Sequence, residues 1–201
     1  MRTMLLGLML VVANLAAAQE PVLFQDRFDG RPADGWTWLR EDAKTWRQAD
    51  GALEIRVEPV AAGNVKNALV RTPPDRRKGN YAVEVTVTFT APPTHQFEQA
   101  GITWYQGGQP KFKLVHENID GSLFVVPGKV PAPDSTVQLR LELRGEKIEA
   151  KFRAAGGQYK TVHQGDLPIA AGEQVSIQCY QGPENETHWV RFDDFRIVEI
   201  Q

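Results

Sequence analysis

The chain has 201 residues, of which 24% are charged and 42% are hydrophobic. These ordinary globular proportions exclude wholesale disorder and a polytopic membrane protein. The formal net charge is −2, so no basic surplus exists to hold a polyanion, and we expect no nucleic-acid partner. The single cysteine, Cys179, excludes an internal disulfide and is expected in the core, which must hold the fold together.

The N-terminus is typical of a secretory signal peptide. Arg2 precedes an apolar stretch over residues 4–13, and three alanines occupy residues 16–18. We therefore expect residues 1–18 to be a cleaved signal peptide and residues 19–201 to form one domain. The mature protein would be exported to the periplasm or the extracellular space and would not associate with a membrane. An uncleaved N-terminal anchor is the alternative.

The mature chain shows the alternation of β-strands nearly throughout. In the clearest segment, residues 81–89, apolar and polar or small side chains alternate for nine residues. Residues 137–144 and 147–152 alternate around Gly145-Glu146 and predict a β-hairpin. No segment shows a convincing helical period. Further strands are expected at 52–57, 68–72, 101–105, 112–117, 123–127, 175–180 and 190–200.

This pattern predicts an all-β domain. Roughly ten to twelve short strands separated by turn residues are typical of a sandwich or barrel. Alternation implies one buried and one exposed face per strand, as in antiparallel sheets. The length exceeds that of an immunoglobulin domain, so we expect a two-sheet antiparallel β-sandwich of the larger jelly-roll type.

Tryptophan is concentrated near the start of the mature chain. Trp36, Trp38 and Trp46 lie within eleven residues, and Arg40 and Glu41 follow Trp38 closely. Sugar sites combine aromatic rings with charged hydrogen-bonding groups, and this run supplies both. The alternative is structural: Trp36 and Trp46 plug the edge of the sandwich, and Arg40 and Glu41 form a surface pair.

Two further strands carry a second set of candidate residues. If the apolar residues of 101–105 and 112–117 face the core, then the residues between them line the opposite face. That face is either a concave binding surface or a solvated sheet face with a cross-strand ion pair. Its residues would be Thr103, Tyr105, Lys113, Val115 and Glu117.

A family resemblance rests on seven segments in a fixed order: "DRFDG", "GWTWLREDAKTWRQADGALEIR", "NALVRTPP", "YAVEVTVTF", "FEQAGITWY", "KFKLVHENIDGSL" and "HWVRFDDFRI". They resemble a secreted bacterial domain-of-unknown-function family with the concanavalin A-like jelly-roll fold. The family is similar to the non-catalytic C-terminal domain of bacterial β-xylosidases. The resemblance implies a concave sheet face that often contacts carbohydrate, and it implies no established activity. Its motifs fall on Trp38, Arg40 and Glu41, on Glu98 and Gln99, and on Lys113 and Glu117.

The leading hypothesis is a secreted, non-catalytic domain that binds an oligo- or polysaccharide on its concave face. Trp38 or Tyr105 would stack against the sugar, and polar side chains would bind its hydroxyls. The expected ligand-binding set is Trp38, Arg40, Glu41, Glu98, Gln99, Tyr105, Lys113 and Glu117.

Two alternatives belong to other function classes. A glycoside hydrolase would use the carboxylates of Glu98 and Glu117, which must then lie in one cleft. A structural or protein-interaction domain would have a concave face that is shallow or filled by its own side chains, and an exposed apolar patch elsewhere would favour it. No nucleophile elbow, phosphate-binding loop or zinc-binding helix motif occurs in the sequence.

Acidic residues near both ends of the domain suggest a structural calcium ion, with Asp29 and Asp194 as ligands, and no other cofactor is expected. The first and last strands of jelly rolls often pair, which would bring these carboxylates together, and calcium prefers such oxygen ligands. The alternative is that Asp193-Asp194 forms a turn or bulge that binds local backbone amides.

Overall fold

The computed structural model describes residues 20–61 and 64–201. These residues form fifteen β-strands and no α-helix, which confirms the all-β prediction. The predicted signal peptide, residues 1–18, lies outside the described residues. Within them, no helix is long and apolar enough to cross a membrane.

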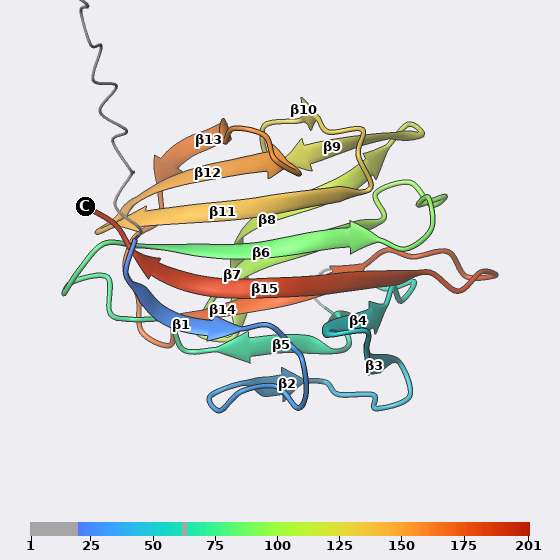
Figure 1. The fold of residues 1–201 in the computed structure, drawn as a ribbon, viewed down its shortest axis with the longest axis horizontal. Coiled ribbons are helices and arrows are strands. Elements are labelled where there is room, and N and C mark those ends of the chain that lie inside the picture. The colour runs from blue at the N-terminus through green and yellow to red at the C-terminus, as the bar shows by residue number, and fades with distance from the viewer. Residues whose placement is uncertain (1–19, 62–63) are drawn as a thin grey trace, which may run out of the picture.

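The strands form two antiparallel sheets that stack face to face (Figure 1). In the eight-stranded sheet the order is β13 (Lys160–Asp166), β12 (Lys147–Ala154), β11 (Thr136–Arg144), β6 (Tyr81–Phe89), β15 (Trp189–Glu199), β4 (Ala52–Arg56) and β3 (Trp46–Ala49), and β1 (Val22–Asp26) pairs with β15. In the seven-stranded sheet it is β10 (Val130–Pro131), β9 (Ser122–Val126), β8 (Gln109–Ile119), β7 (Gln99–Gln106), β14 (Gln174–Tyr180), β5 (Ala68–Arg71) and β2 (Thr37–Leu39). The architecture is that of a β-sandwich, consistent with a jelly roll.

The hydrophobic core fills the space between the two sheets. Val83, Val85 and Val87 of β6 face Ile102 and Trp104 of β7 across it, and all five are fully buried. Burying one such aliphatic side chain contributes about 1.5–3 kcal/mol to folding, so the core is the main stabilising element.

Two expectations about the core are confirmed. Leu114 lies in it, and Phe112 is partly buried and packs against it, as alternation along the strand required. Cys179 is also buried there. The lone cysteine is therefore a packing residue, and burial raises the pKa of its thiol well above its usual value.

Every strand expected from the sequence is present, with shifts of a few residues at the ends. The hairpin around Gly145-Glu146 joins β11 to β12. The sequence pattern does not reveal β1, β2, β3, β10 and β13, because four of them have five residues or fewer and β13 is mostly polar. The first and last strands pair, and Asp26 lies opposite Phe195.

Trp36 and Trp46 have the structural role given as the alternative. The ring of Trp36 packs against Phe24 and Phe195 at the edge of the core, and its Nε1 donates to Asp26 Oδ2 at 3.0 Å. Trp46 also packs against the core from β3. These two tryptophans therefore close the side of the sandwich.

Candidate functional site

The face of the seven-stranded sheet that points away from the core carries most of the candidate residues, and we call it the outer face. Ser176 lies opposite Thr103 in the ladder between β14 and β7, and Thr103 lies opposite Lys113 of β8. Four residues further along these strands, Tyr180 lies opposite Gln99, and Gln99 lies opposite Glu117. Because successive residues of a strand point to opposite faces and their neighbours fill the core, these polar side chains share the outer face.

A hydrogen-bonded chain orders the centre of the outer face. The hydroxyl of Tyr105 donates to Gln178 Oε1 at 2.8 Å, and the one proton of Ser176 Oγ is shared between the same oxygen at 3.1 Å and the backbone oxygen of Ile177 at 3.2 Å. Burial raises the pKa of Tyr105, while its bond to Gln178 and the nearby Arg40 guanidinium oppose that rise. The amide oxygen of Gln178 therefore has two donors, and this fixes the orientation of the amide.

A second network surrounds the ammonium group of Lys113. Lys113 Nζ donates to Gln99 Oε1 at 2.7 Å and to Glu117 Oε2 at 3.2 Å. Gln99 Nε2 in turn donates to Gln181 Oε1 at 2.7 Å. The Glu117 residue is only 5% exposed, so Lys113 compensates a nearly buried charge.

A small cleft of about 170 Å³ opens beside these networks. Two of its polar atoms, Gln178 Nε2 and Thr103 Oγ1, are buried and have no hydrogen-bond partner among the described residues. Gln178 is 0% exposed and Thr103 is 2% exposed. Neither atom bonds to another described residue, so a water or a ligand can complete the hydrogen bonds of each. Its lining residues are Thr103, Pro110, Lys111, Phe112, Lys113, Gln178 and Tyr180.

The two predicted stacking residues do not present rings to a ligand on this face. Trp38 packs on the core side of β2, and its ring centroid is 4.9 Å from that of Trp46. Tyr105 does lie on the outer face, but it is 1% exposed. Its neighbours therefore cover the ring, and only its hydroxyl takes part in the polar network.

Arg40 and Glu41 lie beyond the end of β2 and are exposed. Arg40 Nε donates to the backbone oxygen of Val65, and its guanidinium lies near Tyr105 at the edge of the outer face. Glu41 Oε1 accepts from Trp46 Nε1 at 3.1 Å. Arg40 therefore borders the candidate site, whereas Glu41 interacts with the tryptophan that closes the sandwich.

Glu98 and Glu117 point to opposite faces of the seven-stranded sheet. The residue after Glu98, Gln99, shares the outer face with Glu117, and alternation turns Glu98 the other way. The buried Glu98 carboxylate accepts from His188 Nδ1 at 2.8 Å and from two backbone amides at 3.1 and 3.3 Å. The hydrolase hypothesis built on this pair is wrong, because it required both carboxylates in one cleft.

The calcium hypothesis stays a prediction. Asp194 has φ 46° at a break in the strand register, and its Oδ1 accepts from Gln25 at 3.0 Å. Its other oxygen lies 3.5 Å from Arg196 Nε. Over residues 20–61 and 64–201, no group of three or more His, Cys, Asp or Glu side chains is arranged to hold a metal ion, so Asp29 and Asp194 do not share such a group.

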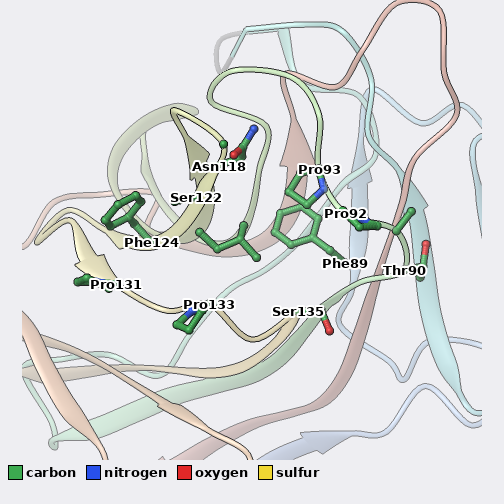
Figure 2. Close-up of a pocket in the computed structure, with 13 residues that line it drawn as sticks. Phe89, Thr90, Pro92, Pro93, Asn118, Ser122, Phe124, Pro131, Pro133 and Ser135 are labelled. Carbon is green, nitrogen blue, oxygen red and sulfur yellow. The ribbon is translucent and has the colours of Figure 1, made fainter.

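A larger cavity of about 710 Å³ lies at one end of the sandwich (Figure 2). It is formed by the end of β6 and by the segments around β9 and β10, with Phe89, Leu123 and Phe124 among its apolar side chains. Four prolines complete much of its wall, and none of the lining residues is charged. None of the residues predicted from the sequence to bind a ligand lines this cavity. It adjoins β8, the strand that carries Glu117.

Several residues of the cleft were missing from the predicted set, namely Thr103, Lys111, Gln178 and Tyr180. The sequence contained a signal for three of them, since alternation already placed Thr103 on one face with Lys113. In Val175–Tyr180 the residues alternate between apolar and polar or aromatic, which predicts one shared face for Ser176, Gln178 and Tyr180. Only the ladder between β14 and β7 shows that this face continues from the one that carries Gln99 and Lys113.

Comparisons with known proteins support the fold. No protein-family profile and no curated protein matches the sequence. The GH43 protein BlXynB from Bacillus licheniformis is similar in structure, with a TM-score of 0.74 and 19% identity, over 88% of this chain and 39% of that one. For Bacteroides ovatus GH43B the TM-score is 0.70 at 14% identity, over 90% and 40% of the two chains. The xylan β-1,4-xylosidase of Bacillus halodurans gives 0.65 at 17% identity, over 90% and 40%. The chain thus spans about 40% of the length of these proteins, and at this identity the likeness shows a common fold.

Proposed function

We propose that this protein is a non-catalytic carbohydrate-binding domain that holds one unit of an oligo- or polysaccharide in the outer-face cleft. The observation that carries the proposal is the pair of buried, unpartnered atoms at the cleft, Gln178 Nε2 and Thr103 Oγ1. Native proteins rarely leave such groups unsatisfied unless a ligand or water completes their hydrogen bonds.

The chemistry of a sugar fits this arrangement. Sugar hydroxyl and ring oxygens accept hydrogen bonds, so a bound ring would satisfy the Gln178 amide and the Thr103 hydroxyl. The aliphatic stems of Lys111 and Lys113 supply apolar contact for the C–H groups of the ring. Recognition would therefore be mainly polar, without an exposed aromatic platform.

Proteins of similar structure suggest the biological context of the proposed function. Proteins of similar fold include the GH43 xylosidases, in which a domain like this one would accompany a separate catalytic part. We place the chain in the domain-of-unknown-function family that its sequence resembles, as an exported protein released by cleavage after Ala18. The opposed positions of Glu98 and Glu117 also favour binding without catalysis.

Glycan-array screening of the mature chain, followed by calorimetry, tests this function. We expect at least one plant, algal or microbial glycan to bind. Gln178→Ala should weaken that binding about tenfold or more, because it removes the side-chain amide N–H donor. Gln48→Ala, an exposed substitution on β3 of the other sheet, is the control and should bind normally. An array with no bound glycan would overturn the proposal.

A second candidate, a protein-interaction domain, is favoured by the uncharged cavity at the end of the sandwich (Figure 2). Selection from a displayed peptide library tests it. Peptides that bind the chain and are lost on Leu123→Asp, together with an empty glycan array, would support this function instead. Peptides unaffected by Leu123→Asp would count against it.

A further inference from the structure

We propose that the sugar unit held in the outer-face cleft is an acidic one, a uronate whose carboxylate binds at Lys111, Lys113, Thr103 and Gln178. This inference rests on the proposed function, because it names the class of sugar that the same cleft would take. It depends on the kind of hydrogen-bonding groups present, their orientation and the charge around them.

The groups that line the cleft are predominantly donors. The two lysine ammonium groups donate only, and the free Nε2 of Gln178 donates as well. The Thr103 hydroxyl can donate or accept. No Asp or Glu lines the cleft. A neutral sugar hydroxyl brings a proton of its own to such a site, whereas a carboxylate accepts on both oxygens and brings no proton.

The orientation of Gln178 makes its amide nitrogen the free group. Its Oε1 accepts from Tyr105 at 2.8 Å and from Ser176 at 3.1 Å. The amide Nε2 is therefore the atom of Gln178 without a partner among the described residues, and the complement of a buried N–H is a strong acceptor.

The charge around the cleft favours an anion. Lys113 is compensated by Glu117, whose carboxylate lies 3.2 Å from its Nζ. Lys111 is exposed and forms no ion pair with any residue in the described part of the chain, so it contributes an uncompensated positive charge. The Lys113 ammonium has three protons and uses two, on Gln99 and Glu117, which leaves one for a ligand.

The size of the cleft limits the ligand to a single unit. A volume of 170 Å³ equals the liquid volume of about six waters, at about 30 Å³ each. That is room for one sugar ring with its carboxylate, and a longer chain would extend over the sheet surface. The cleft would therefore recognise one acidic unit within a polymer or at its end.

Calorimetry on the mature chain tests the inference with four probes: galacturonate oligomers, glucuronate, neutral galactose and glucose oligomers, and sodium sulfate. We expect a uronate to bind at least tenfold more tightly than the corresponding neutral sugar, and added salt to weaken that binding. Lys111→Gln should weaken uronate binding about fivefold and leave neutral sugars unchanged. The matched control is Lys78→Gln, the same change at an exposed lysine outside the cleft, and it should have no effect.

Thr103→Val separates binding from folding. The Thr103 hydroxyl has no partner among the described residues, so this nearly isosteric change should preserve or raise the melting temperature while weakening uronate binding. Equal affinity for neutral and acidic sugars would overturn the inference and leave the proposed function standing. Sulfate binding as tight as that of a uronate would also overturn it, because the site would then be an inorganic-anion site. Failure of every sugar probe would overturn the inference, whereas the proposed function is overturned only if the glycan array is empty as well.

Discussion

The hydroxyl of Tyr105 is the group whose removal tests the organisation of the outer face most directly. Tyr105→Phe keeps the ring and deletes one oxygen, which donates to Gln178 Oε1 at 2.8 Å. A buried hydrogen bond of this kind contributes about 0.5–1.5 kcal/mol to stability. Gln178 Oε1 keeps its bond from Ser176, so no acceptor is left bare. We therefore expect the free energy of unfolding to fall by about 1 kcal/mol.

The same substitution should also affect ligand binding. Without the Tyr105 proton the Gln178 amide is free to turn, and its Nε2 is no longer aimed at the cleft. The loss of one net hydrogen bond corresponds to about a twofold to tenfold weaker affinity. Urea unfolding measures the first effect, and calorimetry with the glycan identified by array screening measures the second.

Tyr81→Phe is the matched control. The Tyr81 hydroxyl donates to the backbone oxygen of Pro74 at 2.9 Å, and Tyr81 is as buried as Tyr105 but lies on the other sheet. It should lose a similar stability and no affinity. The reasoning is refuted if Tyr105→Phe alters neither quantity, or if Tyr81→Phe weakens glycan binding to the same extent.

Three further predictions concern stability. Gly101→Ala should destabilise the fold by at least about 2 kcal/mol, because a Cβ there would lie 2.3 Å from the backbone oxygen of Leu114. Arg140→Ala should cost about 3 kcal/mol, because Arg140 bonds the buried carboxylates of Glu84 and Glu142 at 2.5 and 2.8 Å. Burial alone would raise the pKa of Glu142, but hydrogen bonds from three basic neighbours hold it at about 2, below its ordinary 4.5. The stability from Glu142 is therefore complete above pH 4.5 and is lost as the pH falls towards 2. We expect wild-type protein to lose about 1 kcal/mol more than Glu142→Gln between pH 6 and pH 2.5.

Urea denaturation measures all three. The exposed pair Lys147–Asp166 supplies the control, since Lys147→Ala should leave the unfolding midpoint unchanged. If Arg140→Ala leaves the unfolding midpoint unchanged, as Lys147→Ala should, then the ion pairs of Arg140 with Glu84 and Glu142 do not stabilise the fold. If wild type and Glu142→Gln lose stability in parallel as the pH falls, Glu142 does not carry the acid sensitivity.

The sequence predicted the strands best where burial on one face enforces alternation. The strand at residues 81–89 was predicted with its observed ends, because its apolar residues face the core at every second position. Short strands such as β2 and β3 contain too few residues for a period to show. The polar strand β13 pairs at the edge of its sheet, where little burial constrains its composition.

The candidate site was predicted in part. Gln99, Tyr105, Lys113 and Glu117 do share the outer face, as alternation along two neighbouring strands required. Trp38 and Glu98 do not join them there. β2 has three residues, too few to show a period, so the sequence does not indicate which face Trp38 occupies. Glu98 lies just before β7, and only the pairing of the next residue, Gln99, with Glu117 shows which face each of them occupies.

The sequence by itself determined the class of the fold, the core position of Cys179, and the separation of core and outer residues along each long strand. These properties follow from the two-residue period of a strand, which is local. Only the tertiary structure decided that β14 pairs with β7, which brought Gln178 and Tyr180 of β14 beside Thr103 of β7 and Lys113 of β8. The pairing of β14 with β7 joins residues 69 or more positions apart, from Gln174 with Tyr105 onward, and nothing in a local period encodes it. The cleft with its unpartnered Gln178 amide exists because of that order.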